Sequence, residues 1–288
     1  MKIILSRKGF DSSSGGCPSP ILPDGRLRSL PIPDPYSAIK YSSIHSHDDY
    51  PTGSIVESLT KGKIAASDGA HHDPDIDPTS RSRAKEWRGV FGQSGAAQSH
   101  LEKQQVGIGD VFLFFGLYRR TVEVVGHLAF ERKAPKEHVI WGWLQIGEIV
   151  RIEAGASSPF AWCKDHPHVS HAKQGRHNTV YVASKNLTIP GVDSSLPGSG
   201  IFPKYDPHLR LTAEESKSPL RWRLPSWFAP HNGKSLSMHS DVSRWQPCQE
   251  FRDMVLLESV RRGQEFVIDI GNDRTAKKWL LGILDTGR

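Results

Sequence analysis

The segment GDVFLFFGLYRR, residues 109–120, decides the fold of this 288-residue chain. A Gly-Asp turn signal is followed by a run dense in the aromatic and aliphatic residues that favour β-strands. The segments after it continue in the same manner, with partial alternation of apolar and polar side chains. The strands expected from this pattern are residues 109–120, 121–132, 138–153, 178–184 and 265–271. The middle of the chain is therefore predicted to be mainly β-structure.

Helical patterns are fewer and stand mostly at the edges of this region. We expect helices at residues 81–91, 95–105, 247–263 and 274–284. Twenty prolines and 26 glycines interrupt the chain, and the long irregular stretches among them are 11–36, 184–208 and 215–250. Loops of that length usually line a site or are disordered. The sequence thus predicts an α+β fold in which peripheral helices and long loops surround a small β-barrel.

Composition excludes some classes of protein. The formal net charge of +6, from 37 basic and 31 acidic residues, moderately favours polyanionic partners, although no Lys/Arg tract is present. No apolar stretch approaches the 18 or so residues that a membrane span needs, so we expect no membrane association. The first residues do not resemble a signal peptide, and three cysteines give no disulfide framework. We therefore expect a cytoplasmic protein.

Histidines are abundant and clustered, at 14 in the chain. In AHHDPDIDP, residues 70–78, one imidazole and several carboxylates fall within six positions, and such carboxylates repel one another unless a cation neutralises them. We predict that His72, Asp73 and Asp75 bind a divalent metal or act as acid/base groups, with iron, manganese or zinc as the candidate ions. The alternative is a solvated acidic loop whose aspartates cap the helix expected after it.

A second imidazole pair, His166 and His168, has the i, i+2 spacing of metal ligands on an extended segment. With Asn178 nearby, it could complete a site that His72 and Asp73 begin. A histidine-rich surface loop is the other interpretation. A further pair, His45 and His47, has the same spacing, but its neighbours are the serine, tyrosine and proline residues typical of an exposed loop.

The first loop, SRKGFDSSSGGCPSP at residues 6–20, has the composition of an oxyanion-binding loop. Arg7 and Lys8 would supply positive charge where a strand ends, and glycines would let the backbone approach a ligand. The hydroxyls expected to bind substrate are Ser12, Ser13 and Ser14. Asp11 would repel phosphate unless it acts as an acid/base group, so we predict a catalytic role for it. The lone Cys17 is a secondary candidate.

Other substrate contacts are expected from FGQSGAAQSHL, residues 91–101, where a glycine-rich turn opens a helix that could bind an anion. Gln93, Gln98 and His100 could read a base or a sugar, and Trp143 could stack on a base. Tight helix–strand packing would equally explain the small residues, and most of the eight tryptophans must belong to the core.

Two resemblances follow from these motifs. VGIGDVFLFFG (106–116) and VIWGWLQIGEIV (139–150) resemble the core of PUA-like barrels, which include the ASCH, EVE and YTH domains. The ordered set SRKGFDSSSGG, HHDPDID, FGQSGAAQSHL, WGWLQIGEI, HPH and GQEFV resembles the third nucleotide-modification-associated domain family. The resemblance implies one domain over 1–288 with a PUA-like core at about 100–185, a bacterial or phage source, and nucleotide or nucleic-acid chemistry.

The predicted function is modification of a nucleotide or nucleic-acid base by a metal-dependent enzyme that binds a phosphate-bearing substrate beside the barrel. One alternative is a non-catalytic reader of modified bases, and another is a metal-dependent oxygenase or hydrolase acting on a non-nucleotide substrate. All depend on one expectation: the first loop and the histidine–aspartate segment some sixty residues later must meet at a shared cavity. Oligomeric state does not follow from the sequence.

Overall fold

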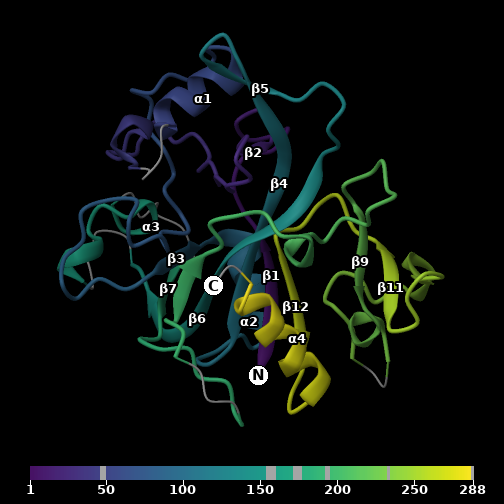
Figure 1. Ribbon diagram of the computed structural model, residues 1–288. Coiled ribbons are helices and arrows are strands. Elements are labelled where there is room, and N and C mark those ends of the chain that lie inside the picture. Colours follow the sequence, from purple (N-terminus) through teal and green to yellow (C-terminus); the bar gives the residue numbers. More distant parts are fainter. Residues whose placement is uncertain (46–49, 154–159, 171–176, 192–194, 232–233, 287–288) are drawn as a thin grey trace.

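The computed structural model describes residues 1–45, 50–153, 160–170, 177–191, 195–231 and 234–286. Its main sheet follows the order β12-β1-β4-β6-β7-β3 (Figure 1). The strands of this path are β1 (Lys2–Arg7), β3 (Val90–Gln93), β4 (Val111–Val124), β6 (Glu137–Arg151), β7 (Thr179–Ala183) and β12 (Glu265–Asp269). β1 pairs with β4 in parallel, and the other neighbours on the path are antiparallel. The N-terminal strand therefore lies beside the central strand of the sheet.

Three short strands extend this sheet at its margins. β2 (Ser19–Ile21) and β5 (His127–Phe130) pair with the far half of β4, and β8 (Ser199–Ile201) pairs with β6. Among the described residues no pairing joins the end strands β12 and β3, so the sheet stays open. The α+β class is consistent with this arrangement. The predicted PUA-like barrel is not confirmed.

Two of the four expected helices form: α2 (Gly95–Lys103) and α4 (Arg274–Leu284). α1 (Thr52–Thr60) and the one-turn α3 (Pro167–Ser170) were not expected. The helix expected at 81–91 is wrong, because its last residues form β3 against β7. The helix expected at 247–263 is also wrong: Met254–Glu258 form β11, the centre of a small sheet between β9 (Arg221–Pro225) and β10 (Trp245–Pro247). Figure 1 shows this second sheet beside the main one.

One large apolar cluster joins both sheets and α4, and its members run from Ile3 to Leu284 along the chain. The expected strands at the centre of the sequence supply most of it, including the fully buried Phe112 and Phe114 of β4. A smaller apolar cluster packs α1 against β5 and against side chains that lie between Phe10 and Ala70 in the sequence. In the described part of the chain no helix has the length and apolarity needed to cross a bilayer. His47 lies outside the described residues.

Stability is expected to fall as the pH drops from 7 to 5. His138 is buried, and its Nδ1 accepts a hydrogen bond of 3.0 Å from Trp222 Nε1. Burial, and then the charge of Arg7, lowers the pKa of His138 to about 3. The unfolded chain gains a proton near pH 6.5 that the folded chain does not accept, so stability is fully present above pH 6.5 and is lost below it. This one group removes about 2 kcal/mol of unfolding free energy between pH 7 and pH 5.

Urea unfolding at the two pH values measures this loss. His138→Gln, which can still accept from Trp222, is the matched variant and should reduce the loss by about the same 2 kcal/mol. The aspartates with lowered pKa values do not titrate in this window. An equal pH dependence in wild type and variant would contradict the assignment.

Candidate metal centre

A cavity of about 950 Å³ opens where β1 and β3 end. Its wall includes the first loop, the segment around His71, the start of α2 and the turn that follows β11. Asp11 and Asp73 both line it. The expected meeting of the first loop with the histidine–aspartate segment is therefore confirmed, and the cavity falls in the size range of small-molecule and cofactor sites.

His71 enters this cavity from a segment held by backbone pairing. Its amide donates to the carbonyl of Ile32, and the neighbouring Ala70 pairs with Pro33. The ring Nδ1 lies 3.0 Å from Asp34 Oδ2. A carboxylate only accepts, so Nδ1 carries a proton, and in the neutral ring the lone pair is on Nε2. His71 is therefore held in the tautomer that can coordinate a metal through Nε2.

His168 is held in the same tautomer by a different partner. Pro167 opens α3, and the Asn178 amide, just before β7, donates through Nδ2 to the His168 carbonyl at 2.8 Å. The Asn178 Oδ1 must then accept from His168 Nδ1, which lies 2.8 Å away. Burial lowers the pKa of His168 to about 4, although the charge of Asp73 acts in the opposite direction. The ring is consequently neutral at pH 7, with its Nε2 lone pair directed at Asp73.

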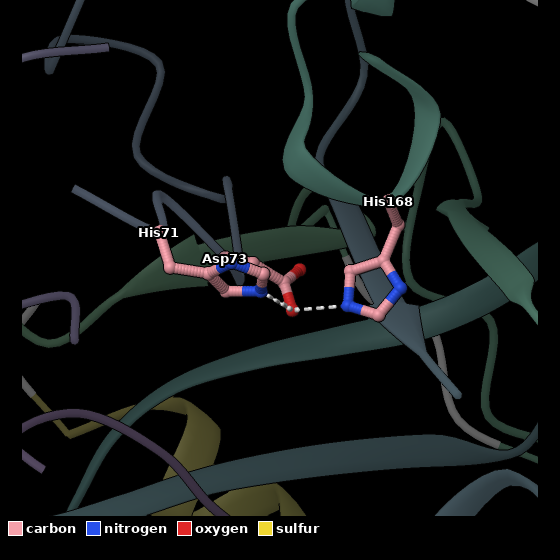
Figure 2. Close-up of side chains that lie close together, drawn as sticks. All are labelled: His71, Asp73 and His168. Atoms are coloured by element: carbon pink, nitrogen blue, oxygen red, sulfur yellow. Dashed lines mark ion pairs between the residues drawn. The ribbon is translucent and has the colours of Figure 1, made fainter. Parts of the chain in front are cut away.

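Asp73 lies between these two rings and is almost fully buried. Its Oδ1 accepts from the Gly92 amide at 2.8 Å and from His166 Nε2 at 3.2 Å. Burial alone would raise the pKa of Asp73, but the His166 hydrogen bond and the charges of His166, His168 and His71 bring it down to about 2. Oδ2 remains directed at the two imidazoles, 3.9 Å from His71 Nε2 and 3.7 Å from His168 Nε2 (Figure 2).

The donor atoms of His71, Asp73 and His168 all lie within 4.8 Å of one another. We call these three residues the His-Asp-His cluster. Each ligand is oriented by a second residue, namely Asp34, Gly92 with His166, or Asn178. Metal-binding histidines typically donate their other ring N–H to a carboxylate or carbonyl in this way. Two imidazoles and one carboxylate facing a cavity can hold a divalent ion and leave coordination positions open.

The predicted metal set divides into two groups. Asp73 and His168 belong to the cluster, and His166 contacts Asp73 with Nε2 while its Nδ1 accepts from the His168 amide at 3.3 Å. His72 and Asp75 face away from it. His72 Nε2 lies 3.1 Å from Asp75 Oδ1, and both Asp75 oxygens accept from Arg83.

This His72–Asp75–Arg83 group neutralises itself. A bidentate guanidinium is the strongest common partner of a buried carboxylate. Burial alone would raise the pKa of Asp75. The charges and hydrogen bonds of His72 and Arg83 outweigh this effect, so the pKa of Asp75 lies well below its usual range. Asp73 and Asp75 therefore have separate partners, because the Gly92 amide donates to Asp73 while Arg83 donates to Asp75.

The first loop lines the cavity, but most of its polar groups have partners. Asp11 Oδ1 accepts from the Ser13 amide and hydroxyl and from the Ser14 amide, which closes the turn. Ser13 and Ser14 line the cavity, and Ser12 is exposed and does not. The predicted catalytic role of Asp11 and the predicted substrate contacts of the serines stay predictions.

Both basic residues of this loop are engaged. The Arg7 guanidinium donates to the carbonyls of Arg261 and Val260. Lys8 Nζ pairs with the buried Glu265 at 2.8 Å. Both line the cavity, although their charge is directed at protein groups.

Among the remaining predicted contacts, Gln93 lines the cavity and the others do not. Gln98 is buried and accepts from the Tyr181 hydroxyl. His100 bonds to Ser237 on a separate cavity, and Trp143 donates to the Pro197 carbonyl within the core. These three side chains lie outside the cavity that contains the His-Asp-His cluster.

Sequence reasoning missed His71, the third member of the cluster. The signal was present: side chains at i and i+2 of an extended segment share a face, and His71 and Asp73 have that spacing. Asp34 carried no comparable signal, because its contact with His71 spans 37 positions.

The fold and the site define an α+β protein whose ligand-sized cavity contains two histidines and an aspartate with donor atoms close enough to hold a metal ion. Residues 2–269 match the family described as nucleotide modification associated domain 3. The chain belongs to this family, as the sequence resemblance implied. Neither a curated protein nor a solved structure matches the chain.

Proposed function

We propose that this protein is a metal-dependent enzyme that modifies a nucleotide or a nucleic-acid base, and that His71, Asp73 and His168 hold its metal ion. The observation that carries the proposal is the donor set: three ligand atoms within 4.8 Å, each oriented by a second residue, at the wall of a 950 Å³ cavity. Membership of a nucleotide-modification family supplies the substrate class.

Two imidazoles and one carboxylate with open positions are typical of non-haem iron(II) enzymes, so iron(II) is the ion we expect first, ahead of manganese and zinc. A bound ion would supply a Lewis acid and positions for ligands to be activated. The chain's own residues would hold His71 in the tautomer that coordinates through Nε2, keep His168 neutral, keep Asp73 ionised and hold the substrate in the cavity. The low pKa of Asp73 and the lowered pKa of His168 favour the ligand forms at neutral pH.

Elemental analysis of purified protein tests the proposal after loading, under argon, with iron(II), manganese(II) or zinc(II). We expect close to one ion per chain, lost in Asp73→Asn, which keeps the shape of the side chain and removes its charge. Asp241→Asn is the control, because Asp241 is an exposed carboxylate that binds Ser243 in its own turn. Metal-free wild-type protein that binds oligonucleotides with steep salt dependence would instead indicate a reader.

A second measurement tests the substrate. Loaded protein is incubated, in air and under argon, with the four deoxynucleoside monophosphates and with a single-stranded oligonucleotide. Mass spectrometry should detect a new nucleoside that Asp73→Asn does not produce. Stoichiometric metal without any altered nucleotide would favour a non-nucleotide substrate.

A further inference from the structure

The turn between β11 and β12, residues 259–264, forms the side of the cavity that is rich in arginine. Arg261, Arg262, Gly263 and Gln264 all line the cavity that also contains Asp73 and His168. Both arginines are exposed. Within the described residues, neither guanidinium makes an ion pair or a side-chain hydrogen bond, which distinguishes them from Arg7 and Lys8.

Arg7 holds this turn in place. Its Nη1 donates to the Arg261 carbonyl at 2.9 Å and its Nη2 to the Val260 carbonyl at 3.2 Å. Its backbone amide donates to the Gln264 carbonyl at 2.7 Å. Arg7 therefore holds both ends of the turn by hydrogen bonds to its backbone. The two exposed guanidiniums extend from this fixed backbone.

The other cation of the first loop is neutralised. Lys8 pairs with Glu265, whose side chain is fully buried, and Gln93 Nε2 donates to the same oxygen at 2.6 Å. Lys8 therefore contributes little net charge to the cavity. Of the acidic groups on the wall, Asp11 binds its own turn and Asp34 binds His71. Among the described residues of this wall, the guanidiniums without a hydrogen-bond or ion-pair partner are those of Arg261 and Arg262.

The start of α2 lies on the same wall, since Ser94 and Gly95 line the cavity. Unpaired N–H groups at a helix N-terminus favour anions, and guanidinium groups bind phosphate through two parallel hydrogen bonds. Gly92 binds Asp73 and stands three positions before Gly95. The chain advances at most 3.8 Å per residue, so the start of α2 lies within about 11 Å of Gly92, the residue whose amide holds Asp73.

We infer that the Arg261–Arg262 turn binds the phosphate of a nucleotide whose base or sugar lies at the His-Asp-His cluster. This inference rests on the proposed function, and it adds the orientation and the size of the substrate. A single cavity of about 950 Å³ contains both ends, which fits one nucleotide unit. The phosphate belongs either to a free mononucleotide or to one nucleotide of a single strand.

Calorimetric titration of the iron-loaded full-length protein under argon tests the inference. The probes are inorganic phosphate, the four deoxynucleoside 5′-monophosphates, the matching nucleosides and a single-stranded octanucleotide. The Arg261→Ala/Arg262→Ala variant should bind the monophosphates at least about tenfold more weakly than wild type, because each of the two substitutions removes a charge-assisted contact with the phosphate. Its metal content should not change.

The control variant is Arg132→Ala/Lys133→Ala, which removes the same charge from an exposed turn that does not line the cavity. It should bind the monophosphates within about twofold of wild type, if local contacts and not net charge decide binding. Loss of octanucleotide binding alone in the arginine variant would support the inference with a strand as the phosphate source.

Three results would overturn it. Equal binding of nucleosides and monophosphates by wild type would remove the phosphate contact. Equal monophosphate binding by the two double variants would assign the effect to net charge. Metal-loaded protein that binds none of the phosphate probes would contradict phosphate binding at the Arg261–Arg262 turn without contradicting the metal centre. Absence of bound metal would instead contradict the proposed function itself.

Discussion

Replacing His71 by alanine is expected to abolish stoichiometric metal binding, whereas replacing its neighbour His72 by glutamine is expected to leave it intact. His71 directs Nε2 at Asp73 within the His-Asp-His cluster. His72 instead binds Asp75 and Ser80 on the other side of the segment. Loss of an outer partner of a ligand typically costs 10–100-fold in affinity, so loss of the ligand itself should cost more than about 100-fold.

The measurement is competitive titration of iron(II) and zinc(II) against a chelator, with circular dichroism to verify that each variant is folded. Glutamine at position 72 can still donate to Asp75, so the buried group around Arg83 keeps a partner. The reverse outcome would be loss of metal in His72→Gln and its retention in His71→Ala. This result would support the ligands expected from the sequence and contradict the His-Asp-His cluster as the metal site. Equal loss in both folded variants would also contradict the assignment.

The sequence predicts a polar site in this segment but not which of the two adjacent histidines belongs to it. The stretch HHDPDID indicated a polar site, and its Asp73 lies in the cluster. The choice between His71 and His72 depended on which strand the segment would meet. Asp75 pairs its backbone with Val90, and Gly92, two residues further along β3, binds Asp73. That contact spans 19 positions and leaves no local pattern.

The fold was predictable where a strand is both apolar and continuous. β4 and β6 are buried along most of their length, and residue type alone predicts a strand at each, although β4 continues to Val124 where a second strand was expected from residue 121. β11 was mistaken for a helix because four successive apolar residues, Met254 to Leu257, suit either structure. Its pairing with β9, about thirty positions earlier, decided the outcome. The closure expected of a barrel likewise depends on contacts between distant edges, which short-range patterns do not encode.

Basic residues were misjudged for a related reason. Arg7 and Lys8 seemed available because they stand in a glycine-serine loop, yet each binds a group about 255 positions away. Burying either charge without a partner would be costly, so the carbonyls of the β11–β12 turn and Glu265 accept from them. Of the arginines that line the cavity in the described part of the chain, Arg261 and Arg262 are left without such partners.

Replacing Gly92 by alanine is expected to weaken metal binding about 10- to 100-fold, comparable to the loss of an outer ligand partner. A methyl group at Gly92 would lie 2.3 Å from His168 Cγ and 2.4 Å from its Cδ2, so the imidazole must move. The Gly92 amide also holds Asp73 at 2.8 Å. One methyl group on β3 thus acts on two of the three ligands. Gly107→Ala is the matched control, since a methyl group there meets no atom within 4 Å.

Overpacking of this kind also costs about 1–3 kcal/mol of stability, and a double-mutant cycle separates that cost from metal binding. In His168→Ala the ring that obstructs the methyl group is absent, so adding Gly92→Ala to it should destabilise the metal-free protein less than Gly92→Ala does alone. Thermal unfolding without metal gives the coupling, and chelator competition gives the affinities. Full metal affinity in Gly92→Ala would mean that His168 can leave its observed position without consequence, and His168 would then not be a ligand.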